Sequence, residues 1–594
     1  MSEEEAKPIE PAEEEESPGP VPAATETPEA KELRAKAESE AQSAIQGTLM
    51  RLGFVNFDTT SADNTTFGAM VAPDWRKHFK RDVYVGIKDK EQSTEFLGRI
   101  VEGPFHAPHE VSTDSAITRT TVLHPDRTQF RPTYYVYGTI EVLGVLTDGE
   151  RLLTTATRPR PYSEIYVFPE SRLRKLLDIE GNFYLGHLMG YTGVKVHADA
   201  TKKSFLPRNV GVFGTVGSGK SNTIQVLMEE ALTAGWAVVA VDVEGEYVRM
   251  NEKTDDANLT KLLQDEHELE AAGVKDLKVY VPMTGHSEAA APLRFKVPIS
   301  QLEPEVISDI LEFSEPQVRL FGRIIDAASR QARASGNRQG VFGGAIAATA
   351  PQRSYTLQTL VDGLTEDASG TFPLLPNIQT PEKSTAHTLR NKLFHLGRSG
   401  MLDWNATANV AELPVDELTV AGRLSVLDVS ETDDRSRNIA IAYTLSALFD
   451  RVIETARGER MPSGKERPPV LVVIEEVHTF VSRESAAKMR AVLDKLQVIS
   501  RRGRKRWMAL ALISQQPGHV PDELFELANT RFIHQLKSVA NLAPVKQTTG
   551  GVHEALWSTV PSLGSGQCLV TGAVFKNPLF VNIRPARSRR LLIG

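Results

Sequence analysis

The feature that most constrains this chain is the stretch GTVGSGKSN at residues 214–222. It follows the short apolar run NVGVF and precedes a segment with helical spacing from Ser221 to Ala234. The stretch fits the pattern G-x-x-x-x-G-K-[ST], and a strand before it with a helix after it is the context that this pattern requires. The sequence therefore predicts a phosphate-binding loop inside an α/β domain.

Each residue type in this loop has a chemical role in binding ATP and Mg²⁺. Glycines let the backbone curl so that its N–H groups face the phosphates, and the helix that starts near Lys220 adds its positive end. Lys220 is expected to reach the β- and γ-phosphates of ATP, and the hydroxyl of Ser221 is expected to ligate Mg²⁺. The predicted nucleotide-binding residues of the loop are Gly214, Thr215, Val216, Gly217, Ser218, Gly219, Lys220, Ser221 and Asn222.

Hydrolysis also needs a carboxylate at the end of a buried neighbouring strand. The segment VLVVIEEVHTF has five apolar residues, Val470 to Ile474, followed by Glu475 and Glu476. Glu475 is predicted to hold the metal, directly or through water, and Glu476 to polarise the attacking water. The alternative is that both carboxylates end an ordinary strand and are simply solvated.

A third requirement is a group that senses the γ-phosphate. The segment WMALALISQQPG is an apolar run that ends in polar Ser514, Gln515 and Gln516. An amide at this place can contact the γ-phosphate or its water, and Gln515 is the first choice, with Gln516 close behind. Glutamines at strand ends can also be turn formers.

The segment VDVEGEY places Asp242, Glu244 and Glu246 after another predicted buried strand. The carboxyl ends of parallel strands are where α/β sheets bind ligands. Asp242 is therefore a candidate to position the metal ligands without contacting the metal itself. Alternatively, it caps the loop that follows.

The run SRRGRKRW is strongly basic, since five of the six residues from Arg501 to Arg506 are Arg or Lys. It can be an arginine finger, a guanidinium placed against the γ-phosphate of a neighbouring subunit, which requires an oligomer. A solvated basic loop and a localisation tract are the alternatives.

The distribution of apolar runs, amphipathic segments and turn residues along the chain predicts several structural units. Continuous apolar runs separated by helical segments indicate a parallel sheet covered on both faces, interrupted by amphipathic helices. Short strand-like pieces before it suggest a small barrel or sandwich. The expected division is a disordered acidic tail (1–45), a β-barrel domain (46–200), the first part of the ATPase core (201–295), a helical insertion (296–408), the second part of the core (409–565), and C-terminal strands with a basic tail (566–594).

Composition narrows the class of protein. The formal net charge is −8, but residues 1–40 hold 13 Glu and 4 Lys or Arg, which is −9, so the rest is near +1 and can still carry a basic channel for nucleic acid. A single cysteine, Cys568, fits a reducing cytoplasm, and neither a signal peptide nor a spanning helix is expected. His106, His109 and Glu110 could suggest a metal, but a loop on a barrel rim is the favoured interpretation.

Taken together, these residues resemble the HerA family of hexameric, ATP-driven DNA translocases, often called helicases. The matching segments are GTVGSGKSN, VDVEGEY, VVIEEVHTF, SRRGRKRW and ISQQPGHVPDELFELANTRFIHQL, which span about residues 205–540. The preceding β-rich segment looks like the HAS barrel of that family, and the helical insertion fits its plan. The long acidic N-terminal extension departs from the family pattern.

The resemblance implies a RecA-like core in a homo-hexamer, with ATP bound between subunits. By position, Lys220 and Ser221 would bind ATP and Mg²⁺, Glu476 would be catalytic, and Gln515 would be the sensor. Arg501 is then the better finger candidate, with Arg504 second. Double-stranded DNA would pass through the pore, and the usual partner is a NurA-like nuclease in DNA end resection and repair.

Three alternatives remain open at this point. Some bacterial relatives pair with other effector subunits in phage defence. Motors of conjugation and secretion systems share the same core and move other substrates. A scaffold that uses ATP only as structural glue is the third, although the full set of catalytic parts argues against it.

Overall fold

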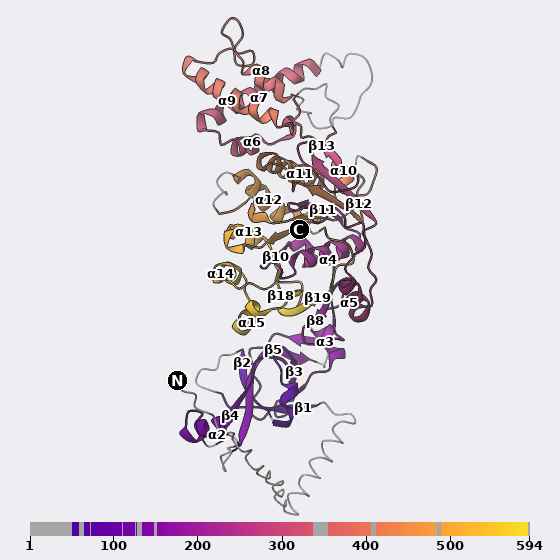
Figure 1. Ribbon diagram of the computed structural model, residues 1–594, viewed down its shortest axis with the longest axis vertical. Coiled ribbons are helices and arrows are strands. Elements are labelled where there is room, and N and C mark those ends of the chain that lie inside the picture. Colours follow the sequence, from indigo (N-terminus) through magenta and orange to yellow (C-terminus); the bar gives the residue numbers. More distant parts are fainter. Residues whose placement is uncertain are drawn as a thin grey trace, which may run out of the picture.

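The computed structural model describes residues 50–591, except 59–64, 72, 110, 125, 127–132, 148–150, 337–354, 405–410, 462, 480 and 484–488. The predicted acidic tail and Glu110 lie outside these residues. Figure 1 shows an elongated molecule with a β-barrel at one end, a large sheet with its helices in the middle and a group of helices at the other end. Among the helices of the described residues, none combines the length and apolar composition needed to cross a membrane.

Six antiparallel strands close the barrel in the order β2-β1-β7-β3-β4-β5, because β5 pairs back onto β2. Val85, Ile87 and Ile140 are among the fully buried residues of its core. The predicted small β-barrel is thereby confirmed. Its elements are β1 (Arg51–Val55), β2 (Thr66–Val71), η1 (Pro73–His78), β3 (Tyr84–Asp89), β4 (Thr94–Pro108), α2 (Ala116–Leu123), β5 (Tyr134–Thr147), β6 (Arg151–Leu153), β7 (Glu164–Val167) and the following α3 (Glu170–Leu176).

The second sheet begins with eight parallel strands, which confirms the predicted α/β class. In spatial order they are β13 (Leu293–Phe295), β12 (Asp276–Pro282), β14 (Arg423–Asp428), β11 (Ala237–Asp242), β15 (Val470–Ile474), β16 (Met508–Ser514), β10 (Val210–Phe213) and β17 (Thr530–Ile533). All residues of β10, β11, β15 and β16 are buried. A strand covered on both faces must be apolar at successive positions, which explains the continuous apolar runs.

Four antiparallel strands extend this sheet: β18 (Gln567–Thr571), β19 (Leu579–Ile583), β8 (Phe183–Leu188) and β9 (Lys195–Ala198). Here the structure differs from the expected division, which placed β8 and β9 in the barrel domain and β18 and β19 outside the core. The pairing of Leu188 with Val581 joins the two pairs of strands. Strand-like sequence does not reveal the partner strand, because pairing depends on residues far apart in the chain.

Helices cover both faces of the large sheet. On one face α4 (Lys220–Thr233) packs Ile224 and Leu227 in the same apolar cluster as Val238 of β11. On the other face the apolar cluster that includes Val239 takes in residues of α10 (Val415–Leu418), α11 (Asp434–Glu454), α12 (Arg490–Arg506), α13 (Asp522–Leu527), α14 (Val539–Gln547) and α15 (Glu554–Thr559). The remaining short elements are η2 (Leu206–Arg208), α5 (Ala257–His267), η4 (Val477–Thr479), η5 (Pro517–His519) and η6 (Val560–Ser562).

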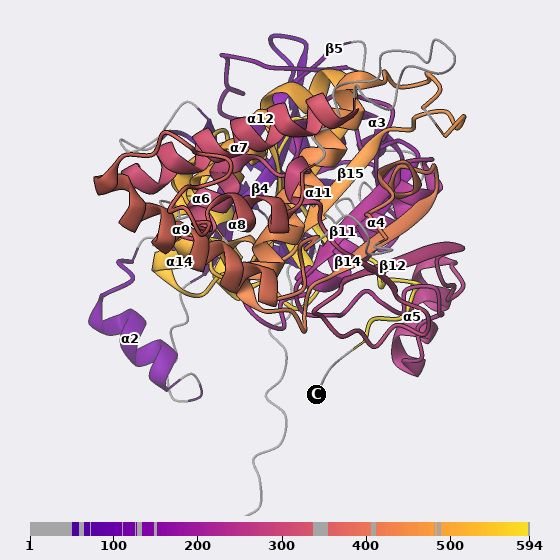
Figure 2. The ribbon, with the colours of Figure 1, turned by 90° about the horizontal axis from the view of Figure 1, so that it is seen from above.

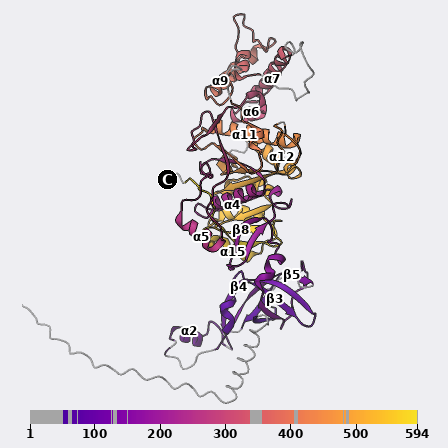
Figure 3. The same ribbon diagram turned by 90° about the vertical axis from the view of Figure 1, so that its right-hand side faces the viewer.

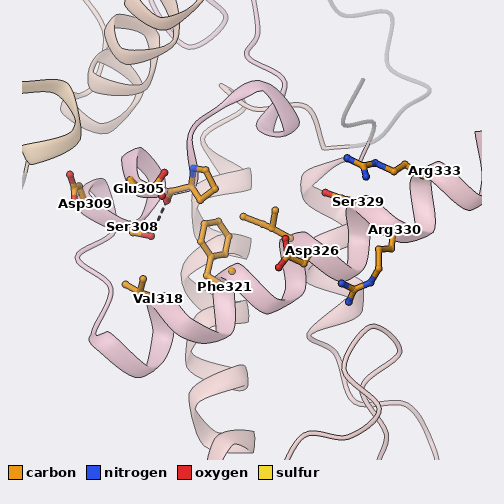
Figure 4. Close-up of a pocket in the computed structure, with 12 residues that line it drawn as sticks. Glu305, Ser308, Asp309, Val318, Phe321, Asp326, Ser329, Arg330 and Arg333 are labelled. Carbon is orange, nitrogen blue, oxygen red and sulfur yellow. Dashed lines mark hydrogen bonds between the residues drawn. The ribbon is translucent and has the colours of Figure 1, made fainter. Parts of the chain in front are cut away.

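The predicted amphipathic helices between β13 and β14 form a separate layer at one end of the molecule (Figure 1). They are η3 (Ile299–Gln301), α6 (Pro304–Ile310), α7 (Glu315–Gly336), α8 (Leu357–Gly363) and α9 (Thr380–Arg398). A pocket of about 650 Å³ lies between α6 and α7, and Asp309, Phe321 and Arg330 are among the residues that line it (Figure 4). This pocket belongs to the insertion and contains no residue of the phosphate-binding loop.

Candidate active site

The loop Gly214–Gly219 connects β10 to α4, in the predicted strand-loop-helix context. Gly217 and Gly219 have φ values of +76° and +103°, in the left-handed region that favours glycine. A Cβ on Gly219 would lie 2.6 Å from the backbone N of Gly566, and one on Gly214 would lie 2.6 Å from Cβ of His534. The backbone at Gly214 and Gly219 is thus in close contact with later parts of the chain, whereas Gly217 is open.

Segments near the C-terminus hold the loop in place. The N–H of Gly566 donates to the carbonyl of Ser218 at 3.0 Å, and the N–H of Thr215 donates to the carbonyl of Gln535 at 2.9 Å. Asn222, in the first turn of α4, donates to the carbonyl of Arg584 at 2.8 Å. These bonds give the phosphate-binding loop a defined shape before any nucleotide binds.

Gly219→Ala is expected to destabilise the ATPase core by about 1–3 kcal/mol, because it combines left-handed strain with a clash against backbone. Gly217→Ala is the matched control, since it carries the same kind of strain but meets nothing within 4 Å. The midpoint of thermal unfolding, measured without nucleotide, checks the difference. Equal midpoints for the two variants would contradict the role given to the Gly566 contact.

Lys220 points back over the loop, where its Nζ donates to the carbonyl of Thr215 at 3.1 Å. Only 5% of the residue is exposed. Burial lowers the pKa of Lys220, while the nearby carboxylates of Glu476 and Glu244 oppose this shift. The ammonium group is therefore held among acidic groups at the place where phosphates would bind.

The acidic pair lies at the same edge of the sheet as the loop. Phe213 of β10 pairs with Ser514 of β16, and Ile474 of β15 pairs with Leu512 of β16. Since parallel strands end at one edge, Glu475 and Glu476, which follow β15, lie beside the residues that follow β10 and β16. The structure thereby brings together the predicted acids, Lys220 and Gln515.

Glu476 has a left-handed φ of +41°, which is unusual for a residue with a side chain. Its Oε2 accepts from the N–H of Gln515 at 3.0 Å and lies 3.1 Å from Nδ1 of His478. Burial alone would raise the pKa of Glu476, but the hydrogen bonds from His478 and Gln515 and the charge of Lys220 lower it on balance. Glu476 is thus kept as a carboxylate, the form that can accept a proton.

Glu475 has a contrasting environment. Its Oε1 accepts from the hydroxyl of Tyr247 at 2.8 Å. Burial, together with Asp242 and Glu246, raises the pKa of Glu475 well above its usual value. Two adjacent carboxyls whose pKa values are shifted in opposite directions are suited to different roles.

Glu244, Glu246 and Glu475 each place one carboxylate oxygen within 4.8 Å of the others. Oε2 of Glu475 is buried and has no hydrogen-bond partner within the described part of the chain. A set of carboxylate oxygens with one unsatisfied buried oxygen suits Mg²⁺, which prefers oxygen ligands. The residues therefore fit the metal, with Ser221 predicted as a further ligand from the start of α4.

Asp242 caps the loop after β11. Its carboxylate accepts from the N–H groups of Gly245 at 2.7 Å, Glu246 at 3.2 Å and Tyr247 at 2.8 Å. Burial raises the pKa of Asp242 to about 7, although the N–H of Tyr247 lowers it. Of the two interpretations of Asp242, these contacts favour the loop cap, which in turn positions Glu244, Glu246 and Tyr247.

Arg501 and Arg504 do not join the site within this chain. They lie near the C-terminal end of α12, which runs antiparallel to β15 and β16, and they line a groove with Asn209, directly before β10. That groove is at the amino edge of the sheet, opposite the phosphate-binding loop. A finger role for either arginine can therefore only be exercised on a neighbouring subunit, and it stays a prediction.

Three residues of the site carried no prediction: Tyr247, His478 and His534. His534 is fully buried beneath the loop, where its Nε2 lies 2.9 Å from Oγ1 of Thr223. Burial and the charge of Lys220 lower the pKa of His534 to about 3, so this ring is neutral at pH 7. For Tyr247 and His478 the signal available in sequence was position, since both follow predicted buried strands, whereas the strand before His534, β17, was not predicted.

His478→Ala is expected to lower kcat for ATP hydrolysis by about 10-fold with little change in KM, because His478 orients Glu476 and lowers its pKa. Loss of this bond raises the pKa of Glu476, so the acidic limb of the kcat–pH profile should move to higher pH. Steady-state kinetics from pH 5 to 9 check this, with His519→Ala, an exposed histidine, as control. An unchanged profile would rule out the positioning role.

Known proteins resemble this chain over about three quarters of its length. Residues 183–449 match the family model described as "Helicase HerA, central domain". The DNA double-strand break repair helicase HerA of Pyrococcus furiosus is 21% identical over 482 residues, 75% of this chain and 77% of that protein. The probable DNA double-strand break repair helicase HerA of Methanocaldococcus jannaschii is 22% identical over 465 residues, 75% of this chain and 84% of that protein.

Among solved structures, VirB4 of Thermoanaerobacter pseudethanolicus aligns with a TM-score of 0.44 and 15% identity, covering 68% of this chain and 96% of that chain. The resemblance to HerA that the sequence motifs indicated is confirmed by the family model and the curated relatives. The predicted class of enzyme, a P-loop ATPase, is confirmed with it.

Proposed function

We propose that this chain, a P-loop ATPase of the HerA type, forms a ring that uses ATP hydrolysis to move along double-stranded DNA. The observation that carries the ATPase part is the convergence of Lys220, Glu475 and Glu476 at one edge of the sheet. The similarity to double-strand break repair helicases supports DNA as the substrate. We further propose action in DNA end processing with a nuclease partner, as the relatives' role in break repair suggests.

The chain's own groups account for the chemistry. Backbone N–H groups of the loop and the ammonium of Lys220 would bind the phosphates of ATP. Glu475 with Glu244 and Glu246, and the hydroxyl of Ser221, would hold Mg²⁺, which neutralises charge on the β- and γ-phosphates. Glu476, ionised and oriented by His478, would orient the attacking water and take up its proton.

Gln515 would couple the loss of the γ-phosphate of ATP to movement of the protein. Its N–H bonds the catalytic carboxylate Glu476, and its half-buried side chain follows β16 at the same edge. A change at the γ-phosphate would therefore displace the end of β16. We propose Gln515 as the sensor on this basis.

Completion of the site requires a second copy. Arg501, or Arg504 as second choice, would act on the ATP of the adjacent subunit, because the amino edge of one sheet must then face the catalytic edge of the next. We propose a homo-hexamer, with the barrel, the sheet and the helical insertion as its three layers. Six copies would enclose a channel for the duplex.

The test of this function is the ATPase rate of the purified chain with and without linear duplex DNA, alongside its mass by light scattering. A large oligomer whose hydrolysis rises several-fold with DNA is expected. Binding should weaken as salt is raised, because the contacts would be mainly to phosphates. Hydrolysis by an assembled ring that ignores DNA would overturn the DNA part and favour a motor that moves another substrate.

A further inference from the structure

Four large apolar side chains form a continuous row across the outer face of the barrel. Phe54 of β1 pairs with Met70 of β2, Met70 pairs with Tyr137 of β5, and Tyr137 pairs with Phe105 of β4. Their exposed fractions are 40%, 40%, 39% and 44% in that order. These four residues are named here the outer row, and they occupy positions that a solvent-facing strand normally gives to polar side chains.

The outer row is broadened by aromatic contacts. The ring centroids of Phe105 and Tyr137 are 5.4 Å apart, and those of Tyr137 and Tyr135 are 5.8 Å apart. Alternate residues of the same strands, such as Val55, Val71 and Val136, are buried in the barrel core. The barrel therefore has its own core, and the outer row is a second apolar surface. A contiguous row of exposed apolar side chains is a candidate interaction site.

One polar group on the same face carries an unpaired charge. The hydroxyl of Thr139 donates to Oε2 of Glu102 at 3.2 Å, and Thr139 is two residues from Tyr137, so Glu102 lies on the face of the outer row. Within the described part of the chain, no ion pair involves Glu102. A partner for this face should therefore be apolar with one positive group.

Helix α2 has the complementary properties. It leaves the ribbon formed by β4 and β5, and Figure 2 shows it standing clear of the other described elements. None of its residues is buried, and Ile117, Val122 and Leu123 are 55%, 74% and 72% exposed. Its one charged residue, Arg119, takes part in no ion pair among the described residues. An eight-residue helix is marginal in water without a packing partner.

We propose that α2 of one copy docks on the outer row of the next copy in the ring, with Arg119 facing Glu102 of that copy. Within one chain the two surfaces do not meet, because α2 stands apart from the barrel (Figures 2 and 3) and buries no residue. A surface and its complement that lie apart on the same chain can pair between copies, and such a head-to-tail contact closes a ring when the rotation between copies closes. The inference rests on the proposed ring and names a barrel interface within it.

Cysteine cross-linking tests the contact, because the native Cys568 is fully buried and should not react. Leu123→Cys protein is mixed with Met70→Cys protein, reassembled and oxidised mildly. A disulfide-linked pair containing both variants is expected, and the double variant should give a ladder of linked copies. Leu123→Cys with Lys88→Cys is the matched control, since Lys88 is exposed on β3 outside the row.

A charge swap tests whether Arg119 of one copy faces Glu102 of the next copy, as proposed. Arg119→Glu should lower the rate of cross-linking about two- to fivefold, the range expected for one exposed ion pair. Adding Glu102→Arg should restore it. Variants that cross-link equally with and without the swap would overturn the Arg119–Glu102 pairing.

The outcomes separate this inference from the proposed function. A large oligomer without the Leu123–Met70 cross-link, or a disulfide formed within a single chain, overturns the docking and leaves the motor standing. A ladder of linked copies whose ATP hydrolysis ignores DNA overturns the DNA motor and leaves the docking. A monomer that forms no cross-link overturns the docking as well.

Discussion

Glu476→Gln is expected to lower the rate of ATP hydrolysis by about 10²–10⁴-fold while ATP still binds. The amide oxygen of the glutamine can still accept the N–H of Gln515, so the loop should keep its shape. It cannot take a proton from water, however, which is the role assigned to the ionised carboxylate. Single-turnover hydrolysis, measured beside binding of a fluorescent ATP analogue, separates the two steps.

The neighbouring Glu475→Gln is the control for this prediction. Glu475 belongs to the group of three carboxylates that fits Mg²⁺. Its loss should raise the Mg²⁺ concentration needed for half-maximal activity, and excess Mg²⁺ should recover part of the rate. Full recovery of Glu476→Gln by Mg²⁺, with no recovery of Glu475→Gln, would show that the two roles are reversed.

Lys220→Ala is expected to weaken ATP binding by about 10- to 100-fold, the loss of one charged hydrogen-bonding group on phosphate. A second effect adds to the first. The ammonium lies among Glu244, Glu246, Glu475 and Glu476, and without it these carboxylates repel both one another and the phosphates. Hydrolysis should therefore be undetectable at ATP concentrations that saturate the unmodified chain.

Equilibrium ATP binding and the midpoint of thermal unfolding check this variant. Lys202→Ala is the matched control, because Lys202 is exposed and pairs with Asp178 at the surface, outside the site. It should bind and hydrolyse ATP normally. ATP binding by Lys220→Ala within about twofold of the unmodified chain would remove the lysine from the phosphate site.

Much of the site could be predicted because its signals are local. A phosphate-binding loop needs glycines, a lysine and a hydroxyl at fixed spacing, and a strand covered on both faces must be apolar throughout. Lys220, Glu475, Glu476 and Gln515 followed from these two rules, since the carboxyl ends of neighbouring parallel strands meet at one edge.

The remaining features depended on pairing between distant segments. The N–H of Gly566 fastens a loop about 350 residues earlier in the chain, and β8 joins β19 rather than the barrel. His534 and His478 acquire their roles from neighbours that sequence spacing does not reveal. The outer row exists only because four strands align Phe54, Met70, Tyr137 and Phe105 in register.

The sequence by itself determined that this chain carries a phosphate-binding loop with Lys220 on an α/β sheet, because that loop is specified by contiguous residues at fixed spacing. Only the tertiary structure decided which carboxyl is kept ionised, which carboxylates come close enough together to hold a cation, and that Arg501 and Arg504 lie on the opposite edge of the sheet. The burial of a side chain, its pKa and the edge of the sheet at which it lies depend on how strands far apart in the chain pack. A local sequence pattern does not reveal that packing.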